Sequence, residues 1–286
     1  MTEVTRRLIV NADDFGLTAG INRAIIEAHA RGIVTSTTVM ANMPRFEEAA
    51  RLAREHPSLG VGLHFNITQG RPVALPARVP SLTGGGGEFL GSGAALVRRA
   101  LSGGVRPEEV ALELRAQLDK CLAAGLRLTH VDSHQHALGL PRVFDALLRT
   151  LPGYGIRALR LPREHPPGRG LSPGRLKQAV VARGLSLLCR PQAEKLRGAG
   201  LVTTDAFFGV TRTGSWSLAW LEGVLAELPE GTSELMSHPG YEDEELLAAG
   251  TRLRASRGVE LRLLTDPGVA ALARAGGVRL VNFGHL

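Results

Sequence analysis

Short apolar runs alternate with amphipathic segments along this chain, and this alternation most restricts the folds open to it. Apolar or β-branched runs that begin at Leu8, Val34 and Leu59 predict strands, and the segments 21–30 and 44–54 between them predict helices. Strands that are separated by helices usually lie parallel in one sheet, because a parallel pair needs a long crossover connection. The pattern therefore predicts an α/β fold with a parallel sheet.

The same alternation continues to the end of the chain. Further helices are expected at 108–124, 141–151, 176–189, 193–199, 218–228, 243–256 and 267–275, and further strands at 126–131, 158–161, 201–206, 231–237 and 278–282. The sequence shows no internal repeat and no clear linker. We therefore expect a single catalytic domain of residues 1–286, built as a (β/α) barrel or a distorted barrel.

Two stretches rich in glycine and proline interrupt the pattern. The first spans about 70–104 and contains four successive glycines at 84–87, and the second spans 162–173. A loop of such length in a compact domain is usually functional or mobile. We expect the first stretch to form a lid or a substrate-binding insertion, with a disordered surface loop as the alternative.

The composition limits which partners and which cell compartment are expected. The net charge is +7, and almost all of the positive side chains are arginines. These arginines are scattered along helices without a nucleic-acid-binding motif, so no nucleic-acid partner is expected. The apolar runs are too short for a membrane-spanning helix, and no signal peptide fits before the first strand. Because Cys121 and Cys189 give no disulfide framework, we expect a cytoplasmic protein without a membrane partner. A homodimer is one open alternative for its oligomeric state.

Acids and histidines collect at the ends of the predicted strands. Asp13 and Asp14 end the first strand, His64 ends the third, His134 follows the strand after the long loop, and His238 follows a late strand. Chemistry in parallel α/β folds gathers at this carboxyl edge. Carboxylate and imidazole ligands suit a divalent cation, and three protein ligands leave one position open for catalysis. We favour Asp14, His64 and His134 as the metal ligands; alternatively, the acid pair is a turn and a helix cap.

Six motifs, in one order along the chain, resemble those of a known family. They are Asn11–Gly16, Gly32–Thr38, Gly62–His64, Gly70–Pro72, Asp132–His136 and His238–Gly240. The sequence resembles the YdjC-like carbohydrate deacetylases, a group that includes the chitooligosaccharide deacetylases. The resemblance implies a barrel of the polysaccharide deacetylase type. It also implies metal-dependent hydrolysis of the N-acetyl group of an acetylated sugar or oligosaccharide, with release of acetate.

The same resemblance implies roles for individual residues. It matches His64 and His134 to metal-binding histidines, Asp14 to a metal ligand and Asp13 to the catalytic base. It implies one divalent ion, usually magnesium, although two imidazole ligands would also suit zinc. Leu138 stands where some members carry a further histidine, and this departure concerns the substrate contacts more than the metal site.

Amide hydrolysis assigns further roles to the candidate residues. Asp13 would accept a proton from the attacking water, and His238 could give one to the sugar nitrogen. His136 is expected to contact the substrate or to support the metal ligands, and Arg71 and Arg160 are candidate sugar contacts. The alternatives are a structural role for His238 and a place on the surface for both arginines.

The adjacency of Asp13 and Asp14 sets a geometric condition. Successive strand residues point to opposite faces, so both carboxylates can enter one site only if the backbone turns there. Gly16, two residues later, allows such a turn. The enzymatic alternatives are a glycosidase, which places two carboxylates on either side of the bond it cleaves, and another metal-dependent amide or ester hydrolase. A non-catalytic sugar-binding protein is the alternative from another class.

Overall fold

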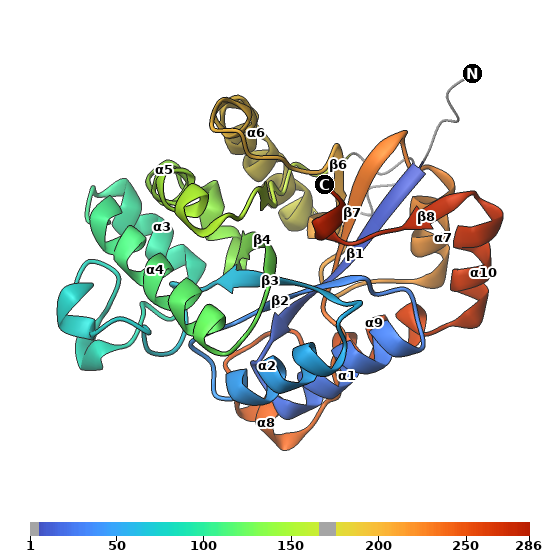
Figure 1. Cartoon of the computed structure of the whole chain (residues 1–286), viewed down its shortest axis with the longest axis horizontal. Helices are drawn as coiled ribbons and strands as arrows, with labels where there is room; N and C mark the ends of the chain where they lie inside the picture. The colour runs from blue at the N-terminus through green and yellow to red at the C-terminus, as the bar shows by residue number, and fades with distance from the viewer. Residues whose placement is uncertain (1–5, 166–175) are drawn as a thin grey trace.

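A curled parallel sheet forms the centre of the molecule, and helices surround it (Figure 1). The computed structural model describes residues 6–165 and 176–286, so most of the predicted loop 162–173 lies outside the described residues. Every strand pair in the described part of the chain is parallel. The predicted α/β fold with a parallel sheet is confirmed.

The sheet is organised around its first strand. The strands are β1 (Arg6–Phe15), β2 (Ser36–Val39), β3 (Gly60–Phe65), β4 (Leu128–Ser133), β5 (Ala158–Leu159), β6 (Ala206–Phe208), β7 (Gly231–Ser237) and β8 (Val278–Leu280). Their order is β5–β4–β3–β2–β1–β7–β6, and β8 pairs with the first residues of β1. Leu8, Ile9 and Val10 of β1 are fully buried, as expected for a parallel strand that is covered on both faces.

The two edge strands come close enough to make the sheet a distorted barrel. Single bridges join Ala158 to Val202 and Glu164 to Phe207, and the amide of His165 donates to the carbonyl of Phe207 over 2.7 Å. The carboxylate of Glu164 also accepts hydrogen bonds from the backbone amides of the turn after β6. The predicted distorted barrel is therefore confirmed, with a seam of isolated bridges in place of a continuous ladder.

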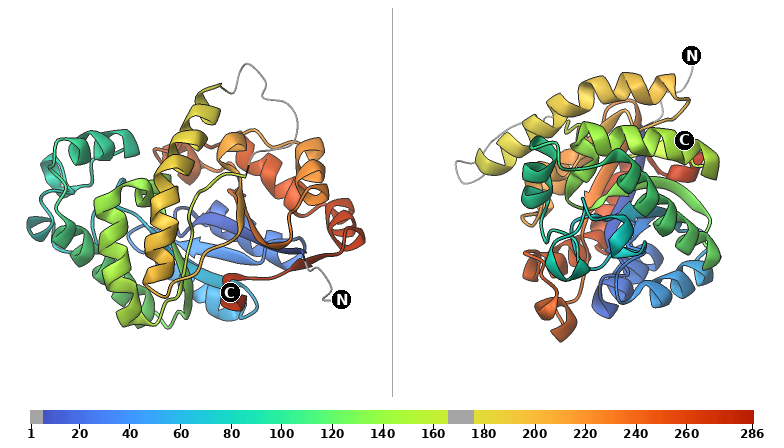
Figure 2. Two further views of the ribbon diagram at one scale, coloured as in Figure 1. Left: turned by 90° about the horizontal axis from the view of Figure 1, so that it is seen from above. Right: turned by 90° about the vertical axis from the view of Figure 1, so that its left-hand side faces the viewer.

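The helices lie around the sheet, as the views in Figure 2 show. They are α1 (Ala19–Ala30), α2 (Phe46–Glu55), α3 (Gly93–Leu101), α4 (Pro107–Ala123), α5 (Pro141–Thr150), α6 (Leu176–Gly198), α7 (Leu218–Ala226), α8 (Glu244–Ala248), α9 (Ala255–Leu264) and α10 (Pro267–Ala275). Thr18 caps α1 by accepting from the amide of Ile21. Among the described helices, none combines the length and the apolar character needed to cross a membrane.

Most predicted elements agree with the structure to within two residues at each end, and three depart from it further. The strand 231–237 and the helix 267–275 agree to the residue. The predicted strand 201–206 is found at Ala206–Phe208 (β6) instead, and Val202 of the predicted segment joins the sheet through an isolated bridge to Ala158. Helix α6 runs without a break through Pro191, where two helices are predicted.

The predicted helix 243–256 is replaced by two shorter helices, α8 and α9. The chain between them includes Gly250, a residue that disfavours helix. Helix α9 escapes prediction because two of its buried positions carry charges, Arg257 and Glu260. These charges break the apolar period by which a helix is recognised.

The glycine-rich stretch 70–104 has defined structure, so the alternative of a disordered loop is wrong. It contains α3, which the sequence pattern does not reveal because the helix begins at a glycine within the glycine-rich stretch. Two buried acids of α4 anchor the stretch: Glu113 accepts from the amides of Val73 and Ala74, each at 2.9 Å, and Glu109 accepts from the amide of Ser81 at 2.7 Å. Figure 2 shows the insertion extending from one end of the molecule.

The C-terminal turn covers the amino ends of the strands. The amide of Phe283 donates to the hydroxyl of Ser36, the first residue of β2, and its ring stacks on His130 with 3.7 Å between centroids. Gly62 of β3 faces the same imidazole, since a Cβ at this position would lie 2.5–2.7 Å from three atoms of the His130 ring. The inside of the barrel is therefore tightly packed around His130.

Replacing Gly62 by alanine should lower the free energy of unfolding by about 1–3 kcal/mol, the usual cost of overpacking a core. Chemical denaturation of the wild type and the variant measures the difference. Gly223 of α7 is a matched control, because a Cβ there meets nothing within 4 Å, and its replacement by alanine should not destabilise the protein. Equal stability of the Gly62 variant and the wild type would contradict the packing argument.

Candidate active site

The carboxyl end of β1 turns sharply at Asp14, and this turn brings two adjacent acids into one site. Asp14 has a φ of +71°, in the left-handed region that is costly for a residue with a side chain. The pairing of β1 with β2 also shifts register between Ala12 and Phe15. The amide of Gly16 then donates to the side chain of Asn22 at 2.7 Å, which holds the turn against α1. The backbone turn that both carboxylates need in order to enter one site is therefore present. It occurs at Asp14 itself, two residues before Gly16.

Asp13 lies in a buried group of charges. Arg160, which follows β5, donates to both oxygens of Asp13 at 2.7 and 2.8 Å, and Asn11 donates to Oδ1 at 2.9 Å. Burial raises the pKa of Asp13, but the Arg160 guanidinium, helped by His64 and His238, outweighs it and holds that pKa well below its usual value. Asp13 is therefore ionised, which is the form that can accept a proton.

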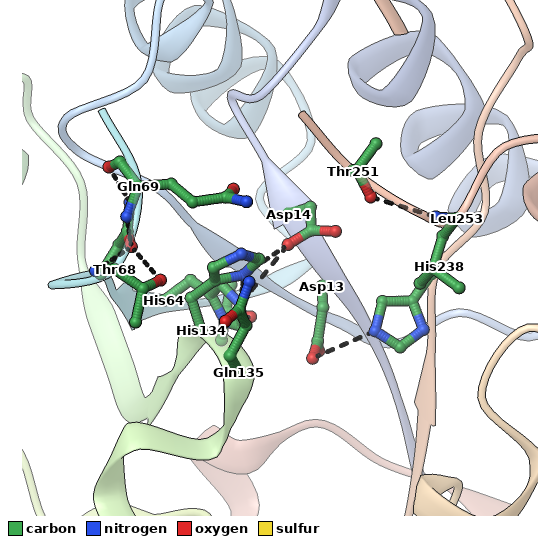
Figure 3. Close-up of polar contacts among 12 residues, drawn as sticks. Asp13, Asp14, His64, Thr68, Gln69, His134, Gln135, His238, Thr251 and Leu253 are labelled. Atoms are coloured by element: carbon green, nitrogen blue, oxygen red, sulfur yellow. Dashed lines mark hydrogen bonds and ion pairs between the residues drawn. The ribbon is translucent and has the colours of Figure 1, made fainter. Parts of the chain in front are cut away.

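Asp14, His64 and His134 point toward one another, as Figure 3 shows. Oδ1 of Asp14 lies 3.5 Å from Nε2 of His64 and 3.2 Å from Nδ1 of His134, and these two ring nitrogens are 3.2 Å apart. This carboxylate oxygen is buried and has no assigned hydrogen bond among the described residues. Three atoms that can each offer a lone pair to one small space form a donor set that fits a divalent cation.

Asp132, at the end of β4, orients the ring of His64. Oδ1 of Asp132 lies 2.6 Å from Nδ1 of His64, and Thr38 donates to the other oxygen at 3.1 Å. Carboxylates commonly support metal-binding histidines in this way. Burial lowers the pKa of His64, but Asp132, followed by Asp13 and Asp14, outweighs it and raises the pKa to about 9. The three surrounding carboxylates thus favour a positive charge at the position of the His64 ring.

Asp13, His64 and Asp132 form a second group with metal-ligand spacing, but Arg160 already neutralises it. The guanidinium lies 2.5 Å from Oδ2 of Asp132 and 2.6 Å from Oε1 of Glu234, in addition to its two bonds to Asp13. A metal ion here would have to compete with a buried arginine. The group of Asp14, His64 and His134 is the better candidate. Arg160 lies buried beside Asp13, so the alternative of a place on the surface is wrong for this arginine. Its contact with a sugar stays a prediction.

His238, just beyond β7, faces Asp13 from the other side (Figure 3). Its Nε2 lies 3.8 Å from Oδ2 of Asp13, and its backbone amide donates to Glu260 of α9 at 2.6 Å. Burial lowers the pKa of His238 to about 4, although Asp13 and Asp14 act in the opposite direction. The imidazole is therefore neutral at pH 7 and must gain a proton before it can act as an acid.

His136 lies in the 3₁₀ turn that follows β4 and contains His134. Gln135 and His136 have φ values of +52° and +55°, so two successive residues are left-handed beside a candidate metal ligand. Such backbone strain is concentrated at functional sites. The side chain of Gln135 accepts from the amide of Gly93 at the start of α3, so the insertion borders the site.

Among the described residues, the side chain of Arg71 pairs with an acid of the insertion and with none of the acids of the site. Its side chain is 68% exposed and stands 4.0 Å from Glu88 within the insertion. Gln69, two residues earlier, donates from its side-chain amide to the carbonyl of Gly250 at 3.4 Å. The loops after β3 and after α8 are therefore in contact with each other.

Four buried charged residues of the site were not assigned a role from the sequence: Asp132, Glu234, Arg257 and Glu260. Arg257 donates to Oδ2 of Asp14 at 2.5 Å. Burial raises the pKa of Asp14, but Arg257 and then the two histidines outweigh it, and the pKa falls well below its usual value. Asp132 had one available signal, since it stands two residues before His134 in the same motif. Glu234 lies in a predicted strand without any motif, and Arg257 and Glu260 lie in α9, a helix that the sequence pattern does not reveal.

Comparisons with known proteins relate nearly the whole chain to one family. The family profile described as YdjC-like protein matches residues 7–275. A carbohydrate deacetylase of Geobacillus stearothermophilus is 39% identical over 97% of each chain. A chitooligosaccharide deacetylase of Yersinia enterocolitica is 34% identical over 96% of this chain and 97% of its own. The crystal structure of an Enterococcus faecalis protein, described as a candidate for cellobiose-phosphate cleavage, superposes with a TM-score of 0.81 at 27% identity over 98% of both chains.

Proposed function

The chain belongs to the YdjC-like protein family, and from this membership we propose that it is a metal-dependent carbohydrate deacetylase. It would hydrolyse the N-acetyl group of an acetylated sugar or oligosaccharide, with acetate and a free amine as products. Relatives that are named carbohydrate and chitooligosaccharide deacetylase support this activity. The observation that carries the proposal is the buried oxygen of Asp14, which faces His64 and His134 beside the ionised Asp13.

Asp14, His64 and His134 would hold the divalent ion, each through one atom. Their fit rests on the buried Oδ1 of Asp14, which faces both imidazoles, and on two ring nitrogens turned toward each other. A bound ion would supply Lewis acidity, which polarises the acetyl carbonyl and makes a water molecule easier to deprotonate. The carboxylate oxygen suits magnesium, which the family resemblance favours, and the two imidazoles also suit zinc.

Asp13 and His238 would move the protons of the reaction. Asp13 takes a proton from the attacking water, and His238 gives one to the sugar nitrogen as the C–N bond breaks. Oδ2 of Asp13 and Nε2 of His238 are 3.8 Å apart, so a proton accepted by the acid has a short path to the neutral ring. A positioned acid or base of this kind typically contributes about 10²–10⁴ in rate. Arg160 keeps Asp13 ionised, and His136 and Arg71 remain proposed substrate contacts.

The protein supplied with a divalent ion should release acetate from N-acetylated sugars, with chitobiose and longer chito-oligomers as first substrates. Mass spectrometry should show the loss of an acetyl group with all glycosidic bonds intact. Treatment with a chelator should stop the release, and added metal should restore it.

Other outcomes of the same screen identify the alternatives. Cleaved glycosidic bonds without acetate would favour a glycosidase. Hydrolysis of simple amides or esters without any action on sugars would favour a different metal-dependent hydrolase. Sugar binding without either product would favour a non-catalytic sugar-binding protein.

A further inference from the structure

Helix α9 places two buried charges against the active site. Arg257 and Glu260 are three residues apart, so they share one face of the helix, and each is only 1% exposed. Arg257 donates to Asp14, and Glu260 accepts from the backbone amide of His238. One helix therefore contacts both a proposed metal ligand, Asp14, and the proposed proton donor, His238.

The guanidinium of Arg257 is held in one position by its surroundings. One terminal nitrogen donates to Oδ2 of Asp14 at 2.5 Å, and Nε donates to the carbonyl of Leu253 at 3.1 Å. In the described part of the chain, Asp14 is the only acid with which Arg257 forms an ion pair. Gly240 leaves room for the arginine, because a Cβ there would lie 2.9 Å from Cδ of Arg257. The close approach of Arg257 therefore explains why the third residue of the His238–Gly240 motif is a glycine.

This ion pair divides the two oxygens of Asp14 between two tasks. Oδ2 is taken by Arg257, while Oδ1 faces His64 and His134 at 3.5 and 3.2 Å. The left-handed backbone of Asp14 persists only if its surroundings determine it. Without the arginine, the carboxylate is free to rotate away from the two histidines, and Oδ1 would no longer be held between their ring nitrogens.

We propose that Arg257 is a positioning residue that holds Asp14 as a one-oxygen ligand and thereby sets the affinity of the site for a divalent ion. This inference rests on the proposed metal site and goes beyond it by assigning a residue that is not itself a ligand. Partners that orient a metal ligand from behind typically contribute about 10–100-fold in metal affinity. The planar guanidinium can serve Leu253 and Asp14 together, which a lysine ammonium does less well.

The test is a calorimetric titration of metal-free protein with Mg²⁺ and, separately, with Zn²⁺, in the absence of sugar. Arg257→Gln should weaken binding by about 10–100-fold, and Arg257→Lys should give an intermediate loss. Arg262→Gln is the matched control, because Arg262 is an exposed arginine on the same helix, and its Kd should equal that of the wild type. Circular dichroism of the metal-free variants checks that each is folded.

A double-mutant cycle separates positioning from a general structural effect. In an Asp14→Asn background, Arg257→Gln should cause little further loss of metal affinity, because the arginine acts through that carboxylate. Full additivity, or a folded Arg257→Gln protein with the wild-type Kd, overturns the inference. If Arg257→Gln does not fold, a folded Arg257→Lys protein with the wild-type Kd overturns it as well. If the wild type itself binds neither metal, the proposed metal site fails, which is a different result.

Discussion

Replacing Asp13 by asparagine should lower turnover by about 10² or more while the protein keeps its metal and its affinity for sugar. The amide can hydrogen-bond to water but cannot accept its proton. The fold should persist, because Arg160 retains Asp132 and Glu234 as partners after Asp13 loses its charge. Steady-state kinetics measures kcat, and elemental analysis measures metal content.

Asp14→Asn is the matched control for this experiment, and its losses should come in the opposite order. Asparagine is a neutral and weaker ligand for a hard cation, so metal affinity should fall first and excess metal should partly restore activity. The variant also leaves Arg257 without its ion pair. Breaking a buried pair costs about 3–5 kcal/mol, so the metal-free protein should unfold at a lower temperature than metal-free Asp13→Asn.

The pattern of losses decides between the two roles. Loss of metal in Asp13→Asn together with retained metal and lost turnover in Asp14→Asn would exchange the base and the ligand. Full activity in both variants would remove the acids from the chemistry and return them to a turn-and-cap role.

Removing both candidate imidazoles should abolish specific metal binding. His64→Ala/His134→Ala deletes two of three ligands, so the affinity should fall by more than the roughly 10²-fold that loss of a supporting partner can cost. Elemental analysis of gently purified protein and titration of metal-free protein both measure this change. His29→Ala/His56→Ala is the matched control, because these rings bond to backbone carbonyls away from the site. A double variant at 64 and 134 that binds metal as well as the wild type would show the assignment to be wrong.

Periodicity and strand ends carried much of the information that could be read from the sequence. The order of apolar runs and amphipathic segments predicts the parallel sheet, because burial on both faces demands continuous apolar strands. The carboxyl ends of parallel strands lie at one edge, so Asp13, Asp14, His64 and His134 could be expected together before their distances were known. The turn that admits both acids could be inferred as a condition, but its place at Asp14 could not, because a left-handed non-glycine residue has no reliable sequence signal.

Only the tertiary structure decided how the charges of the site are balanced. Arg160 is 147 residues from Asp13 along the chain, and Arg257 is 243 residues from Asp14. Local patterns cannot reveal such pairs, because their energies depend on burial and on distances that exist only after folding. For the same reason α9 was missed: a buried charge looks like a surface residue in the sequence until its partner is known. The sequence by itself determined which residues could do chemistry, and the fold determined which partners hold them in a charged and oriented state.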